Sequence, residues 1–136
     1  MRGISLLLAA AVIGSCATAS SPPPVRSAQG AADFARLTAD RVAQPPVACL
    51  PTYNTNDQTI IDEQTIAYRV DANRIYIAHM QDGGCPGLGR VNYTLVTKTF
   101  GGTGLCRGDI AQIADIPNHI TLGSCVFGDF TPYVKP

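Results

Sequence analysis

Five cysteines and two histidines are the residues of this chain best suited to covalent, metal-binding or acid–base chemistry. The spacings between the last four cysteines, 36, 21 and 19 residues, lack the close pairs that bring two zinc ligands together. The chain also begins with an export signal, described below, and exported cysteines meet an oxidising compartment. We therefore predict two disulfides and no metal site, formed by Cys49, Cys85, Cys106 and Cys125.

The pairing of these cysteines is not fixed by the sequence, because four cysteines allow three connectivities. A turn predicted at residues 115–118 would fold the flanking strands so that Cys106 and Cys125 lie nearly opposite each other. The favoured prediction is therefore Cys106–Cys125 together with Cys49–Cys85.

The two histidines lie outside any recognisable catalytic motif. His79 ends a predicted strand, and with Asp82 in the following loop it could orient a base or bind a metal. We favour a strand-end histidine hydrogen-bonded to a loop, and for His119 a solvated turn residue. Asp109 is a further candidate functional residue under the alternative that the protein is an enzyme or inhibitor. A glycosidase-like carboxylate pair stays open, but nothing singles out two acids that face each other.

Two short motifs invite a functional interpretation that their surroundings do not favour. The glycine-rich residues 100–106 lack the Gly-Lys-Ser/Thr ending of a phosphate-binding loop and precede a predicted strand, so we expect a hairpin turn. Arg107-Gly108-Asp109 matches the tripeptide by which adhesive proteins bind integrins. A Gly-Asp pair is also common in turns that lead into a strand, and we favour that interpretation. With ten basic and ten acidic residues and no basic stripe, nucleic acid is an unfavoured partner. No cofactor is predicted.

The N-terminal residues have the features of an export signal. Arg2 precedes an apolar run at residues 4–13, typical of a signal peptide and too short for the about 20 residues that span a bilayer. Residues 13–16, Ile-Gly-Ser-Cys, resemble a bacterial lipobox, which predicts a signal peptide of residues 1–15 and acylation of Cys16. The alternative is cleavage after residues 17–19, Ala-Thr-Ala, which would release a soluble protein. Ala17 directly follows the cysteine that we predict to be acylated. By resemblance to the sorting of lipoproteins in enterobacteria, this residue implies that the protein is anchored in the outer membrane.

Composition divides the rest of the chain into three parts. Residues 16–30 are rich in Pro, Ser and Ala and predict a spacer. Helical spacing of Ala31, Phe34, Ala35 and Val42 predicts a short helix over residues 31–44, ended by two prolines. Its mixed polar face favours packing on the domain edge over binding to a membrane surface.

Residues 49–136 show the period-two patterns and turns of a β domain. Alternating apolar residues and turn residues predict strands at 58–62, 65–70, 74–80, 91–99, 109–114 and 120–125, with a short strand near Phe127. The predicted fold class is all-β or β-rich: a small, disulfide-stapled antiparallel meander or barrel of about six strands.

Several elements resemble a family of small envelope proteins of proteobacteria with a domain of unknown function. The resemblance covers most of residues 49–133. It rests on the export signal, Cys49-Leu50, the hairpin at 65–79, Cys85-Pro86-Gly87-Leu88, Cys106-Arg107-Gly108-Asp109 and Gly123-Ser124-Cys125. It implies a β-rich domain and supplies no catalytic residues, and the long Pro-rich spacer departs from the pattern.

The expected function is that of a cell-envelope lipoprotein that is not an enzyme. It would be held on the periplasmic face of a membrane by its lipid and would bind an envelope protein or support an assembly. A small periplasmic enzyme or inhibitor using His79, Asp82 or Asp109 is one alternative. A binder of a small ligand within the barrel is another.

Overall fold

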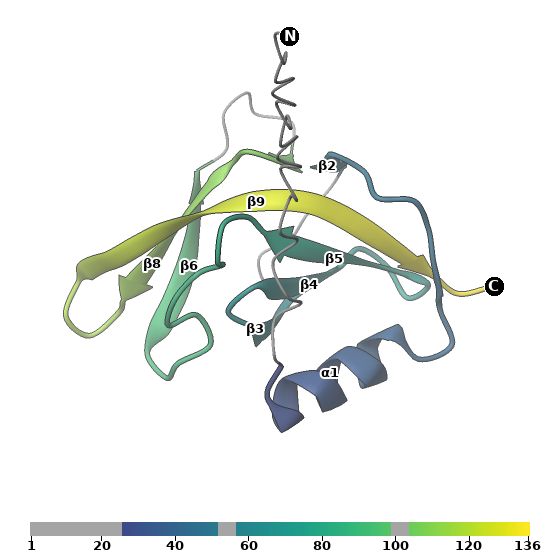
Figure 1. The fold of residues 1–136 in the computed structure, drawn as a ribbon, viewed down its shortest axis with the longest axis horizontal. Coiled ribbons are helices and arrows are strands. Elements are labelled where there is room, and N and C mark those ends of the chain that lie inside the picture. Colours follow the sequence, from purple (N-terminus) through teal and green to yellow (C-terminus); the bar gives the residue numbers. More distant parts are fainter. Residues whose placement is uncertain (1–25, 52–56, 99–103) are drawn as a thin grey trace, which may run out of the picture.

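The computed structural model describes residues 26–51, 57–98 and 104–136 (Figure 1). The predicted signal peptide, Cys16 and most of the spacer lie outside the described residues. The prediction of a β-rich fold is confirmed: one helix accompanies a curled antiparallel sheet, and two disulfides cross-link the chain. Within those three segments, no helix is long and apolar enough to cross a membrane.

Helix α1 runs over Ala28–Thr38, earlier in the sequence than the predicted 31–44. It begins there because the Ser27 side chain caps it, accepting a hydrogen bond from Gly30 N at 3.1 Å. It ends well before the prolines because Val42–Ala43 forms β1, which pairs with the C-terminal strand. Leu37 is buried with Ile61, Ala67, Ile75 and Ile77, so α1 packs on one face of the β3-β4-β5 half of the sheet, whereas the sequence favoured packing on the domain edge.

The first three long strands form a meander. They are β3 (Gln58–Asp62), β4 (Thr65–Arg69) and β5 (Arg74–Met80), and their bounds agree with the prediction to within one residue. The agreement follows from short runs rich in Ile, Thr and Tyr, which favour strands, and from the turn at Asp71. The Asp71 carboxylate accepts hydrogen bonds from the backbone N of Asn73 and Arg74.

The sheet then departs from a simple meander. Its order is β3-β4-β5-β9-β8-β6, so β6 (Tyr93–Lys98) lies at the far edge and β8 (Ile110–Asp115) is next to it. The last strand, β9 (Ile120–Val134), is continuous where a strand to residue 125 and a second near Phe127 were predicted. Residues 120–126 of β9 pair with β8 and residues 127–134 with β5, so one strand joins both halves (Figure 1).

The disulfide pairing predicted from the sequence is wrong. Cys49 bonds to Cys106 and Cys85 to Cys125. The reason is a small separate sheet in which β2 (Cys49–Leu50) and β7 (Leu105–Cys106) place Cys49 directly opposite Cys106. The residue opposite Cys125 across the β8–β9 hairpin is Ala111.

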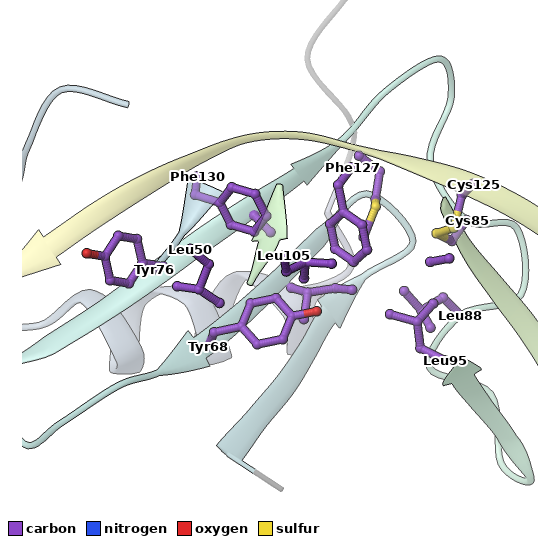
Figure 2. Close-up of a cluster of buried hydrophobic side chains, with 14 of the residues drawn as sticks. Leu50, Tyr68, Tyr76, Cys85, Leu88, Leu95, Leu105, Cys125, Phe127 and Phe130 are labelled. Atoms are coloured by element: carbon purple, nitrogen blue, oxygen red, sulfur yellow. A yellow bond between two sulfur atoms is a disulfide. The ribbon is translucent and has the colours of Figure 1, made fainter. Parts of the chain in front are cut away.

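Alternating residues of the strands face two apolar clusters on opposite sides of the sheet. The larger cluster includes Tyr68, Phe127 and Phe130 and is covered by Leu50 and Leu105 of the β2–β7 pair (Figure 2). The smaller cluster lies under α1 and contains Leu37, Ile61, Ala67, Ile75 and Ile77. The sheet therefore has a core on both faces of its β3-β4-β5 half.

Candidate functional site

Three features of the surface could take part in function: a group of charged side chains where the described chain begins, a cleft beside it, and an apolar end of the sheet. The first centres on Arg26. Its Nε lies 3.0 Å from Oδ2 of Asp62, and its guanidinium carbon lies 4.0 Å from the ring centroid of Phe34. These contacts fix the start of α1 against the end of β3.

His79 belongs to the same group, because it pairs in register with Thr65, whose hydroxyl lies 3.5 Å from the Arg26 guanidinium. His79 is exposed on β5, but partial loss of hydration lowers its pKa, the positive charge of Arg26 lowers it further, and Asp62 acts in the opposite direction. The charges that act on His79 thus come from Arg26 and Asp62, whereas the sequence pointed to Asp82. Asp82 is exposed in the following loop with a φ of 45°.

The cleft has a volume of about 520 Å³ and lies between the N-terminal end of α1 and the β3–β4 turn. Its walls combine the apolar Ile60 and Leu88 with polar groups, and it is lined by Ser27, Gln29, Gly30, Asp33, Ile60, Ile61, Asp62, Glu63, Gln64, Leu88 and Gly89. This volume suits a small organic ligand.

The three carboxylates in the cleft all have partners within the domain. Asp62 accepts from Gln64 N at 2.8 Å, in addition to Arg26, and Glu63 accepts from Gly87 N at 2.7 Å. Hydrogen bonds from Gln29 and Arg36 hold the pKa of Asp33 below its usual value. Among the described residues, no three His, Cys, Asp or Glu side chains are grouped to hold a metal ion. The carboxylates therefore stabilise the local fold and give the cleft an acidic wall.

Asp109 and the adhesive-like tripeptide have structural roles. The Asp109 carboxylate is buried and accepts from Cys106 N at 2.7 Å, and its own N donates to Cys106 O at 3.0 Å. Arg107 makes an ion pair with Asp129 at 2.9 Å. The Asp109 contacts close the turn between β7 and β8, the Arg107 ion pair ties this turn to β9, and Asp109 is not presented to solvent.

His119 lies in the turn between β8 and β9, exposed and with a φ of 53°. The turn is built by Asp115, whose carboxylate accepts from the backbone N and the side-chain amide of Asn118 at 3.2 and 2.8 Å. His119 therefore occupies the turn position that the sequence predicted.

The apolar end of the sheet surrounds this turn. Four aliphatic side chains there are between 44% and 86% exposed, and we call them the apolar tip: Val91, Ile116, Ile120 and Leu122. The backbone segments that carry them adjoin, because Ile116 N donates to Asn92 O at 3.0 Å and Ile120 on β9 pairs with Asp115 on β8. Leu122 is the extra residue at a register shift between β8 and β9.

Sequence reasoning missed both the apolar tip and the role of Arg26. The tip had a signal, since residues 110–128 carry only Asp115 and His119 as ionisable groups, apart from the disulfide-bonded Cys125. No feature of the sequence indicated the role of Arg26, because this residue falls in a stretch with the composition of a spacer. Comparison with known proteins gives no further guide to the site: no family model, curated protein or solved structure matches this chain.

Proposed function

We propose that this protein is a lipoprotein of the bacterial cell envelope, anchored through Cys16, whose domain works by binding an envelope component and not by catalysis. The signal peptide and the lipobox-like residues 13–16 support the anchor. The two disulfides indicate an oxidising compartment outside the cytoplasm, which agrees with a domain on the periplasmic face of a membrane. Ala17, the residue after Cys16, favours the outer membrane as that membrane.

The observation that carries the binding role is the apolar tip. Isolated exposed aliphatic residues are ordinary on protein surfaces, but a group of them marks an interaction site. Of the nine large hydrophobic side chains that are exposed in the described chain, four belong to the tip. Two more, Val96 and Ile110, lie on β6 and β8 of the same half of the sheet.

Photo-crosslinking in living cells tests this proposal. A photoreactive residue replaces Ile120 in the tip and, in a matched control, Val70, which is also exposed but lies after β4 in the other half of the sheet. We expect a specific cross-linked species at Ile120 and none at Val70. Equal, diffuse labelling at both positions would reject the tip as the binding surface.

A second candidate function, binding of a small ligand, is favoured by the cleft of about 520 Å³ beside α1. Native mass spectrometry of the protein purified from the envelope would show a bound molecule as added mass. Gln29 is exposed at the cleft, so a bulky Gln29→Trp substitution should remove that mass if the cleft holds the ligand. Unchanged added mass in this variant would place the ligand elsewhere.

A further inference from the structure

The two disulfides of the domain differ in how far their cysteines are open to solvent. Cys49 is exposed and Cys106 is half-buried, whereas Cys85 and Cys125 are 0% and 5% exposed. Cys85 and Cys125 belong to the larger apolar cluster, among whose side chains Figure 2 draws them. Exchange requires access to the sulfur that is attacked, so a thiolate from solvent can reach Cys49 but is kept from the buried pair by the fold.

From this difference we infer that Cys49–Cys106 is a site of thiol–disulfide exchange, which a protein dithiol opens while Cys85–Cys125 stays oxidised. Such a site goes beyond the proposed binding function and does not depend on the anchor at Cys16. It gives the domain a reduced form in which the β2–β7 pair has lost its covalent link.

The exchange proceeds in two steps that transfer two electrons. A thiolate of the partner attacks Sγ of Cys49 and forms a mixed disulfide, and Sγ of Cys106 leaves as a thiolate that takes up a proton. The second thiol of the partner then attacks its own sulfur in the mixed disulfide and releases Cys49 as a thiol. The partner dithiol is thereby oxidised to a disulfide, and its two protons and two electrons reside on Cys49 and Cys106.

Hydrogen bonds to β9 hold the chain on both sides of this disulfide, and none of them depends on the bond between the sulfurs. Before β2, Val47 N donates to Phe130 O at 2.8 Å, and Phe130 N donates to Val47 O at 2.9 Å. After β7, Gly108 N donates to Phe127 O at 2.9 Å, and Phe127 N donates to Asp109 O at 3.0 Å. Reduction should therefore release β2 and β7 locally and leave the rest of the sheet folded.

The released strands carry part of the larger apolar cluster. Leu50 and Leu105 are fully buried and lie opposite each other in the β2–β7 ladder, each next to a bonded cysteine. Each strand has only two residues, and so short a ladder opens at a low cost in free energy once the crosslink that closes it is gone. Reduction should then let Leu50 and Leu105 leave the cluster and expose apolar surface that the oxidised domain keeps from solvent.

Graded reduction of the native protein tests the exchange site. The full chain is expressed with its own leader, purified in the oxidised form, exposed to dithiothreitol and quenched with iodoacetamide at increasing times. Peptide mapping reports the alkylation of each cysteine. We expect Cys49 and Cys106 to be alkylated at least about tenfold faster than Cys85 and Cys125, because only the first pair is accessible. In concentrated urea the two pairs should react at similar rates. Equal rates in the native protein, or faster reduction of Cys85–Cys125, would overturn the inference.

A trapping experiment tests the reaction with a protein dithiol. The probe is a thioredoxin variant whose second active-site cysteine is replaced by serine, so that it cannot resolve a mixed disulfide. We expect a covalent adduct linked through Cys49, and the double substitution Cys49→Ser, Cys106→Ser should abolish it. An adduct linked through Cys85 or Cys125, or no adduct with the wild-type protein, would contradict the assignment.

Hydrogen exchange measured by mass spectrometry tests the local opening. The protein reduced only at Cys49–Cys106 is compared with the oxidised protein, and the Cys49→Ser, Cys106→Ser variant serves as a form that cannot reoxidise. We expect peptides from residues 47–51 and 104–109 to exchange several-fold faster after reduction, with the β4–β5 hairpin at residues 65–80 unchanged. Faster exchange in both regions would mean that reduction unfolds the whole domain. That result, or unchanged exchange in both regions, would reject a local opening.

Discussion

Cys49 and Cys106 lie directly opposite each other in the β2–β7 ladder and are joined by a disulfide that spans 57 residues of sequence. The second disulfide, Cys85–Cys125, spans 40 residues and fastens the loop after β5 to β9. Together they tie the first part of the domain and the loop after β5 to its last third. The Cys49–Cys106 bond also holds the strand pair that carries Leu50 and Leu105, which belong to the larger apolar cluster.

Removing either disulfide should destabilise the domain strongly. For closed loops of this length the chain-entropy model gives about 4 kcal/mol each, a large part of the about 5–15 kcal/mol that stabilises a typical domain. We expect Cys106→Ser and Cys85→Ser each to lower the free energy of unfolding by about 2–4 kcal/mol in urea titrations. Nonreducing peptide mapping should yield the Cys49–Cys106 and Cys85–Cys125 peptides, and a Cys49–Cys85 peptide would contradict the fold.

Two adjacent glycines should respond differently to alanine. Gly83 and Gly84 both have positive φ, 92° and 85°, so a side chain costs about 1–2 kcal/mol at either position. A Cβ at Gly83 would meet open space, whereas at Gly84 it would collide with the carbonyl oxygen of Glu63. Gly84→Ala should therefore destabilise the domain by about 1–3 kcal/mol more than Gly83→Ala. Equal effects in thermal unfolding would show that the loop does not pack against the β3–β4 turn as described.

The stability of the domain should fall on acidification through His79 by a small amount, because this side chain is exposed on β5 and solvent screens its charge. Its pKa in the folded protein lies below the ordinary 6.5, so the unfolded chain binds the proton more readily. The contribution of neutral His79 is therefore present above about pH 6.5 and is lost as the pH falls through the folded pKa. His79→Gln should reduce the loss of stability between about pH 7 and about pH 5. An unchanged pH dependence would mean that His79 is not desolvated in the folded state.

The charge of Arg26 should be visible in the titration of His79. Because the guanidinium lowers the pKa of His79 and Asp62 raises it, Arg26→Gln should move that pKa upward. An NMR titration of the imidazole resonances checks the direction. Arg36→Gln is the matched control, since Arg36 pairs with Asp33 on the exposed side of α1 and is not among the charges that act on His79. A downward shift for Arg26→Gln would contradict the arrangement at the start of α1.

The strands were predictable where local chemistry is strong. Ile75, Tyr76 and Ile77 are of residue types enriched in strands, and the Asp71 turn fixes the β4–β5 hairpin, so sequence alone located these elements. The disulfide pairing was not predictable in this way. It depends on β2 and β7, two strands of two residues each whose pairing is long-range and leaves no periodic pattern.

The same distinction holds for the candidate sites. The turn at residues 115–118 was predicted from its residue types, but the exposure of Ile116, Ile120 and Leu122 depends on how β8 and β9 extend beyond the core. Likewise, His79 was singled out by sequence, whereas its charged neighbours depend on tertiary structure. Asp62 is brought near by the pairing of β3, β4 and β5, and Arg26 by the packing of α1 on the sheet.

The N-terminal residue of the mature protein tests the central claim of an anchored module most directly. Mass spectrometry of the protein isolated from bacterial membranes should find Cys16 at the N-terminus, carrying the mass of its acyl chains, with residues 1–15 removed. The Cys16→Ala substitution should abolish the acylated species. The protein should then appear in the soluble periplasmic fraction or as its uncleaved precursor. An unmodified N-terminus at Ser20 in the wild-type protein would contradict the account.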